Sequence, residues 1–274
     1  MCKVESHEPL WLYALGFSRF TFRLHLLLIM RFSTEFAIRS SYEPGPDGSL
    51  QHAHIVRMAL EAGYLVTEAL GMGYRWFEEK GFIFVVYGIK TEFVALTRSN
   101  ERIRVETWLS QAKRVRGQRE IAFTSAEDGR VIANVQLDWV FVDRKTLAPA
   151  RMPPEVVEKF PIDPTHACQP YSPSPNGTPV GEAHIWQHRV EYREIDILEH
   201  VNTAVYLEWF AQAWSDATGR LPNQVQRQHC VFNKSALYGD TVYVRTQAID
   251  NGTWRQEVRQ VATDEVLVTN MLRG

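Results

Sequence analysis

One order of secondary-structure elements occurs twice along this chain, and that repeat constrains the fold more than any other feature. In the first half, Phe36–Glu43 is predicted to be a strand, and an amphipathic helix follows the Pro- and Gly-rich residues 44–48. The apolar residues of this helix recur at intervals of three and four: Ile55, Ala59, Ala62, Val66 and Ala69. Four more strands are predicted after it, at Phe82–Leu96, Glu101–Val115, Arg119–Ser125 and Val131–Val142.

The second half repeats this order. Ile185–Tyr192 is predicted to be a strand, and residues 201–217 are predicted to form a helix with one apolar face. Four strands are again expected, at His229–Ala236, Thr241–Ala248, Thr253–Ala262 and Glu265–Leu272. A helix laid on an antiparallel sheet, made twice, indicates a duplicated α+β unit.

The repeat divides the 274 residues into four pieces. We expect an N-terminal extension outside the fold at residues 1–30, a first half at 31–160, a linker at 161–183 and a second half at 184–274. The linker is indicated by its content of Pro, Ser, Asn and Gly. The extension is apolar but contains Arg19 and Arg23, which argue against a membrane span. An upstream extension and a helix lying on a membrane surface both remain open.

Charge and cysteine content exclude several classes of protein. The 30 basic and 32 acidic residues give a formal net charge of −2, so no field that would attract nucleic acid is expected. The three cysteines, Cys2, Cys168 and Cys230, are scattered, which argues against a disulfide framework or a four-cysteine zinc site. No set of residues has the spacing of metal ligands, so we expect neither a metal nor a cofactor.

The segment Val190–Trp209 carries the most specific pattern in the chain. From Asp196 to Trp209 it reads Asp-x-x-x-His-Val-Asn-x-x-x-Tyr-Leu-x-Trp. This pattern resembles the hotdog-fold thioesterases, both the 4-hydroxybenzoyl-CoA type and the thioesterases of acyl-acyl-carrier-protein (acyl-ACP). The first half is similar to the N-terminal hotdog of the acyl-ACP enzymes at Leu70–Tyr74, Phe77–Gly81 and Val105–Trp108. The resemblance implies a tandem (double) hotdog that releases a free fatty or related acid from acyl-ACP or acyl-CoA.

The resemblance also implies where the chemistry takes place. It places the family's aspartate at Asp196 and its histidine at His200, with Asn202 as a further candidate that orients the turn. The family's asparagine falls on Leu198, and the Glu-Cys pair of the plant-type enzymes falls near Ala236-Leu237. An Asp-centred scheme therefore fits better than the plant-type mechanism. Asp196 would serve as general base or nucleophile, and the start of the second helix would polarise the thioester carbonyl.

Simpler interpretations of the same residues stay open. Asp196 is a favoured residue for capping a helix, and His200 can be a packed or solvent-facing histidine. His52 and His54 occupy the equivalent place in the first half and suggest a second site. Asp47, however, lies five residues before His52, whereas Asp196 lies four residues before His200.

Two other functions remain as alternatives. The departures at Leu198 and Ala236-Leu237 suggest a non-catalytic binder of acyl thioesters, and the fold also occurs in hydratases and dehydratases, although no good match to their helix start is present. We expect acyl carrier protein or acyl-CoA as substrate, no nucleic acid, no stable membrane insertion, a cytoplasmic location and a monomer or homodimer. The acyl chain is expected between helix and sheet of the first half. A local basic patch, Lys113-Arg114-Val115-Arg116 with Arg119, is the expected docking point for an acidic carrier.

Overall fold

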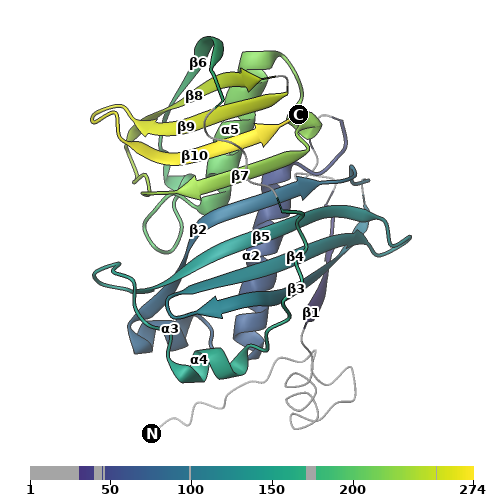
Figure 1. The fold of residues 1–274 in the computed structure, drawn as a ribbon, viewed down its shortest axis with the longest axis vertical. Helices are drawn as coiled ribbons and strands as arrows, with labels where there is room; N and C mark the ends of the chain where they lie inside the picture. The colour runs from purple at the N-terminus through teal and green to yellow at the C-terminus, as the bar shows by residue number, and fades with distance from the viewer. Residues whose placement is uncertain (1–30, 40–44, 46, 99, 171–176, 251) are drawn as a thin grey trace, which may run out of the picture.

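The described strands form one continuous antiparallel sheet. The computed structural model describes residues 31–39, 45, 47–98, 100–170, 177–250 and 252–274, so the expectation for residues 1–30 lies outside the described residues. The 10-stranded sheet has the order β1-β3-β4-β5-β2-β7-β10-β9-β8-β6 (Figure 1). The order shows that each half of the chain contributes five neighbouring strands, and that the halves meet where β2 pairs with β7.

The expected order of elements is present in both halves. The first half contains β1 (Phe32–Ala37), α2 (His52–Ala69), α3 (Tyr74–Lys80), β2 (Phe82–Phe93), β3 (Arg102–Lys113), β4 (Arg116–Ser125), β5 (Val131–Asp143) and α4 (Pro154–Lys159). The second contains β6 (Val180–Arg189), η2 (Tyr192–Glu194), α5 (Thr203–Thr218), η3 (Pro222–Gln224), β7 (Arg227–Phe232), β8 (Thr241–Asp250), β9 (Thr253–Gln260) and β10 (Val266–Arg273). The prediction of a strand, a long helix and four strands, made twice, is confirmed.

The predicted bounds of the first strand were wrong by several residues. The strand expected at Phe36–Glu43 is β1 at Phe32–Ala37, and residues 40–44 lie outside the described residues. Glu35 of β1 forms ion pairs with Arg102 at 3.5 Å and Arg104 at 3.2 Å on the neighbouring strand β3. These contacts join residues almost seventy positions apart, so the local pattern could not reveal this pairing.

Other boundaries differ for local reasons. Helix α3 was not predicted: it lies between Gly73 and Gly81, and Gly81 ends it in the left-handed conformation at φ 73°. The strand expected at His229–Ala236 ends at Phe232, because the next two backbone N–H groups both donate to the Leu267 carbonyl. Strand β6 begins at Val180, inside the stretch expected to be linker.

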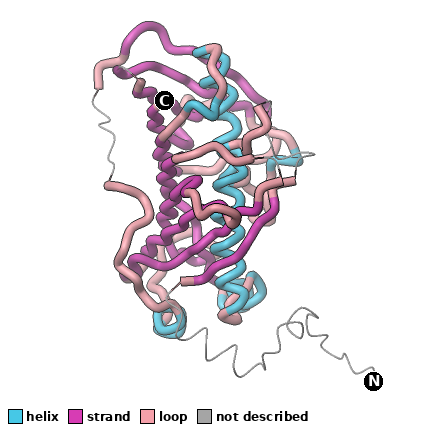
Figure 2. The backbone as a smooth tube through the Cα atoms, turned by 90° about the vertical axis from the view of Figure 1, so that its right-hand side faces the viewer, coloured by secondary structure: helices cyan, strands magenta, loops and turns pink. Residues whose placement is uncertain are grey.

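Both long helices lie on the same face of the sheet. Figure 2 shows α2 and α5 as one column of helix beside the sheet, and Figure 1 shows that this column crosses the strands. An ion pair of 2.7 Å between Arg57 and Glu208 joins the two helices. Helix α5 buries Tyr206, Phe210 and Trp214 almost completely, and burial of large apolar side chains is the main stabilising contribution of such a helix. The predicted helix-on-sheet architecture with a shared core is confirmed.

The joint between the halves contains one fully buried pair of small or apolar residues. At the pairing of β2 with β7, Ile89 lies opposite Cys230, and both are at most 1% exposed. The Cys230 thiol donates to Asn270 Oδ1 at 3.4 Å, and burial raises its pKa. Its neighbour His229 is only partly buried. Cys230 therefore acts as a small core residue, as expected for strand neighbours that point to opposite faces.

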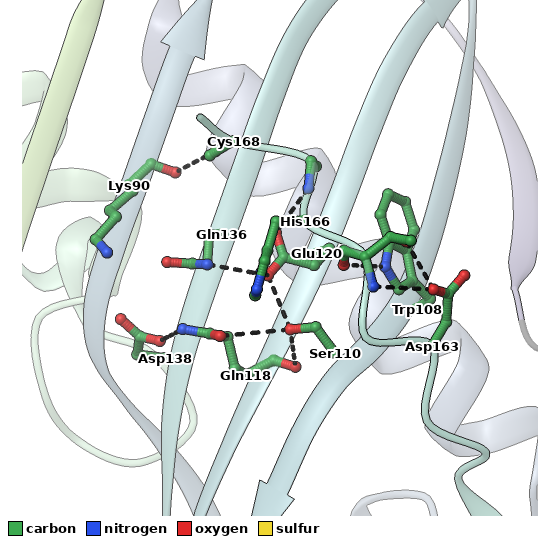
Figure 3. A network of polar contacts seen from close by, with 12 residues as sticks. Lys90, Trp108, Ser110, Gln118, Glu120, Gln136, Asp138, Asp163, His166 and Cys168 are labelled. Atoms are coloured by element: carbon green, nitrogen blue, oxygen red, sulfur yellow. Dashed lines mark hydrogen bonds and ion pairs between the residues drawn. The ribbon is translucent and has the colours of Figure 1, made fainter. Parts of the chain in front are cut away.

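The first part of the predicted linker is fastened to the outer face of the sheet. Figure 3 shows the carboxylate of Glu120, which is fully buried, between two strand side chains and this segment. Ser110 Oγ and Gln136 Nε2 donate to it at 2.8 and 2.9 Å, and the Ala167 backbone N–H donates at 3.1 Å. His166 Nδ1 lies 3.0 Å from the same carboxylate. Residues 161–170 thus cover the sheet on the side opposite the helices.

Among the described residues, none of the helices has both the length and the apolar character needed to cross a bilayer.

Candidate active site

A cavity of about 590 Å³ lies between helix α2 and the sheet of the first half. Its walls are mainly apolar and come from α2, α3, α4 and strands β2 to β5: examples are Leu60, Met72, Phe77, Phe84, Leu109 and Val156. The second half reaches it through one loop, which contributes Asp196, Ile197, Leu198 and Asn202. The volume is in the usual range for a small-molecule site. One half thus provides an apolar chamber, and the other brings a carboxylate to it.

The loop from Ile195 to Val201 is a closed turn that fixes the Asp196 carboxylate. The Asp196 backbone N–H donates to the His200 carbonyl at 2.9 Å, and Asp196 Oδ1 accepts the Leu198 backbone N–H at 2.8 Å. Glu199 adopts the left-handed conformation at φ 63°, which lets the chain reverse within the turn. Within the described part of the chain, the other Asp196 carboxylate oxygen has no hydrogen-bond partner. One oxygen is held in place, and the other remains free to act.

Asn202 begins helix α5. Its side-chain Oδ1 accepts the Ala204 backbone N–H at 3.0 Å, and its own N–H donates to the Glu194 carbonyl at 2.8 Å. It is therefore the helix cap, a role that the sequence analysis gave as an alternative for Asp196. Asp196 lies six residues before this cap, on the loop that leads into the helix.

The structure separates the three predicted site residues. Asp196 and Asn202 line the cavity, whereas His200 is not among its described lining residues. His200 is half-buried, and its backbone carbonyl closes the turn. Leu198, at the position of the family's asparagine, does line the cavity.

The segment at the position of the plant-type Glu-Cys pair lies beside this turn. The Ala236 carbonyl accepts the Val201 backbone N–H at 3.0 Å, and the Ala236 N–H donates to the buried Tyr206 hydroxyl at 2.7 Å. Burial raises the Tyr206 pKa, so this hydroxyl stays neutral. The segment Ala236-Leu237 carries no acid or thiol.

A buried carboxylate that the sequence analysis missed anchors the loop. Glu194 accepts hydrogen bonds from the indole Nε1 of Trp209 at 3.0 Å and the backbone N–H of Glu191 at 2.7 Å. Its Oε2 lies 2.9 Å from His188 Nε2. Burial alone would raise the Glu194 pKa, but these hydrogen bonds outweigh it and the pKa is lowered. The only sequence signal was the spacing Glu191-x-x-Glu194, which resembles a capping box.

One residue of the basic patch expected on the surface is in fact buried. Arg119 is only 7% exposed and lines the cavity, so it cannot belong to a surface patch. Lys113, Arg114 and Arg116 are exposed at the turn between β3 and β4. A period of two along β4 turns Arg119 toward the helices and its neighbour Glu120 to the outer face.

The suggested second site at His52 is not assembled. The His52 ring stacks on Phe93 with ring centroids 3.4 Å apart, and burial lowers its pKa to about 3. The Asp47 carboxylate is instead bonded by Ser49 and by Asn223. Across the described residues, no group of three or more His, Cys, Asp or Glu side chains could hold a metal ion.

The comparisons with known proteins agree with this geometry. Residues 30–160 match the family model described as acyl-ACP thioesterase N-terminal domain, and residues 177–271 match the one described as acyl-ACP thioesterase C-terminal domain. No curated protein sequence matches the chain.

Solved structures show the same fold. An acyl-ACP thioesterase from Bacteroides thetaiotaomicron is 17% identical, with a TM-score of 0.77 over 89% of this chain and 97% of that one. The 12:0-ACP thioesterase from Umbellularia californica is 16% identical, with a TM-score of 0.72 over 89% and 97%. The tandem hotdog expected from the sequence is thereby confirmed. Because the two family models together span most of the chain, the protein belongs to the acyl-ACP thioesterase family and is a thioester hydrolase.

Proposed function

We propose that the protein hydrolyses acyl-ACP to a free fatty or related carboxylic acid at the loop that carries Asp196. The observation that carries this proposal is the position of Asp196: it lines an apolar cavity most of whose walls come from the first half. An acyl chain fits the apolar walls, and its thioester end belongs beside the carboxylate. Acyl-CoA is the alternative carrier. Turnover measured on acyl-ACP and on acyl-CoA distinguishes the two.

The proposed reaction uses the turn and the helix start together. An oxygen nucleophile attacks the acyl carbon, the C–S bond breaks, and the thiolate leaves and takes up a proton. Asp196 acts either as the general base on water or as the nucleophile that forms a mixed anhydride. The start of α5, capped by Asn202, stabilises the negative charge that develops on the carbonyl oxygen. A burst of thiol release that precedes acid release identifies the nucleophilic route.

His200 stays in the proposed site as a positioning residue. Its carbonyl closes the turn that holds Asp196, at 2.9 Å from the Asp196 N–H. This contact is made by the backbone and is therefore independent of the side chain. The additional role proposed for the imidazole is to orient water or the thioester.

The decisive test is Asp196→Asn. Asparagine keeps the Oδ1 that accepts the Leu198 N–H, so the turn should keep its shape, but it cannot accept a proton or attack the thioester. We expect kcat on acyl-ACP and acyl-CoA panels to fall at least about 100-fold while the melting temperature stays unchanged. Glu199→Gln removes an exposed carboxylate from the same turn and should leave kcat within about twofold. Full turnover by Asp196→Asn would refute the site assignment.

We also propose that residues 31–274 act as one unit, with 31–160 holding the acyl chain, 161–183 as the connection and 184–274 carrying Asp196. Because one sheet runs through both halves, each half would expose the β2–β7 edge if it were separated. A monomer is the proposed state, with a homodimer as the alternative, and a cytoplasmic location is part of the same proposal. Sedimentation of the full chain and cell fractionation test these points.

A further inference from the structure

One charged side chain in the cavity is not used by the proposed hydrolysis. Arg119 of β4 is 7% exposed and points toward helix α2, where its aliphatic part passes over Gly63. A Cβ atom built on Gly63 would lie 3.4 Å from Arg119 Cδ. The guanidinium lies among the apolar walls of the cavity, beside the ring of Phe160 at 5.5 Å.

Among the described residues, no carboxylate pairs with this buried cation. Its hydrogen bond from Nη1 to Thr107 Oγ1 is long, at 3.4 Å. Arg57, which also lines the cavity, is paired with Glu208. Burial lowers the pKa of Arg119 to about 10, so the group still carries its charge at neutral pH. An unpaired buried charge is strongly destabilising, which makes its presence here informative.

A second donor lies in the neighbouring wall. Trp139 of β5 lines the same cavity, and its indole N–H is buried without a hydrogen-bond partner among the described residues. Trp139 lies opposite Gly117 and Arg119 opposite Leu137, so both side chains project from the same face of the sheet. This part of the cavity therefore holds donors and a positive charge that the protein itself leaves unsatisfied.

Arg119 and Asp196 come from different parts of the fold. Strand β4 is separated from the second half by β5 and β2, and two strand spacings put it about 10 Å from β2. Asp196 comes from the second half, on the loop before α5. A ligand group that reaches Arg119 would therefore lie along the acyl chain, away from the thioester.

We propose that Arg119 is a binding subsite for a carboxylate carried by the acyl chain at a position distal to its thioester. The enzyme would then favour acyl chains that carry a second acid group. A carboxylate matches the planar donor fork of arginine with two parallel hydrogen bonds and neutralises its charge. A hydroxyl or carbonyl oxygen could accept a hydrogen bond but would leave the charge uncompensated. This inference rests on the proposed function, because it assumes that the acyl chain occupies this cavity.

The test measures binding without turnover. Thioether analogues of acyl-CoA, which cannot be hydrolysed, are compared at equal chain length with a methyl, hydroxyl or carboxylate end. Isothermal titration is done on wild type, Arg119→Met and Arg119→Lys. The control Arg245→Met removes an exposed arginine of strand β8 in the second half. We expect wild type and Arg245→Met to bind the carboxylate-ended analogue about tenfold or more tightly than the methyl-ended one. Arg119→Met should reverse this preference, and Arg119→Lys should keep part of it.

Other results would overturn the proposal. Equal affinity of the wild type for the methyl and carboxylate ends would overturn it, and so would a preference that survives in Arg119→Met. A plain fatty acid is the second source of a carboxylate and is titrated as a separate arm. If only the binding of the plain fatty acid depends on Arg119, the guanidinium recognises the released product instead. The proposal then fails. Because the analogues report binding, failure to hydrolyse any thioester would refute the proposed function without deciding this test.

Discussion

The anchor at Glu194 permits a quantitative prediction, and Glu194→Gln is the perturbation that tests it. Three donors converge on this carboxylate: the Trp209 indole N–H, the His188 ring and the Glu191 backbone N–H, at 3.0, 2.9 and 2.7 Å. The residue itself is 8% exposed. Its backbone carbonyl accepts the Asn202 N–H, so the same residue connects the anchor to the start of α5.

The expected cost follows from the number of acceptors. Glutamine has one acceptor oxygen where glutamate has two, and its NH₂ group would face at least one of the three donors. Losing one hydrogen bond to a charged group and leaving a buried donor unpaired costs about 2–3 kcal/mol. For a chain of this size, that loss corresponds to a decrease in melting temperature of about 4–12 °C.

The loss should also depend on pH in a defined direction. The Glu194 pKa is lowered in the folded state below its ordinary value of 4.5. The carboxylate therefore stabilises the fold fully above pH 4.5, and this stabilisation is lost as the pH falls through the folded-state pKa. The stability difference between wild type and Glu194→Gln should be constant near neutral pH and should narrow in acid.

The assay is urea unfolding at several pH values, together with kcat on the best thioester substrate. The control is Glu199→Gln, which makes the same chemical change at an exposed position of the adjoining turn. We expect the control to remain within about 0.5 kcal/mol of wild type and Glu194→Gln to lose activity as well as stability. A Glu194→Gln protein as stable as the control at neutral pH would refute the anchoring role.

Two further predictions concern the rest of the fold. Ile89→Ala, at the buried joint opposite Cys230, should lower the free energy of unfolding by about 2–5 kcal/mol and keep a single transition in urea, whereas separate transitions would show that the halves unfold independently. His52 stacks on Phe93 and has its pKa lowered from 6.5 to about 3 by burial, so the stability of wild type should fall as the pH drops from 6.5 toward 3. His52→Gln should flatten that part of the pH profile, and an unchanged slope would contradict the assignment.

Local patterns were sufficient to place the elements that repeat and to single out the segment of the proposed site. Helix periodicity and hairpin signals are properties of neighbouring residues, so α2, α5 and most strands could be placed without tertiary information. The spacing from Asp196 to Trp209 likewise lies in one continuous segment. The turn and the helix start that hold Asp196 and Asn202 are built from hydrogen bonds within that segment.

Features that depend on contacts between residues far apart in the chain could not be predicted from the sequence. The position of β1 depends on its antiparallel pairing with strand β3, far along the chain, and the anchor at Glu194 depends on Trp209 fifteen residues later. Arg119 looked like one member of a basic surface run, because sequence neighbours say nothing about which face of a strand is covered.

The sequence by itself therefore determined the duplicated α+β plan and the segment in which the chemistry is proposed. Both depend on residues that lie close together in the chain. Only the tertiary structure decided that the apolar cavity of one half receives Asp196 from the other, and that Arg119 lies buried in its wall. The reason is physical: a cavity and the charge inside it are made by packing helices against one face of a shared sheet, and that face is selected by contacts between residues far apart in sequence.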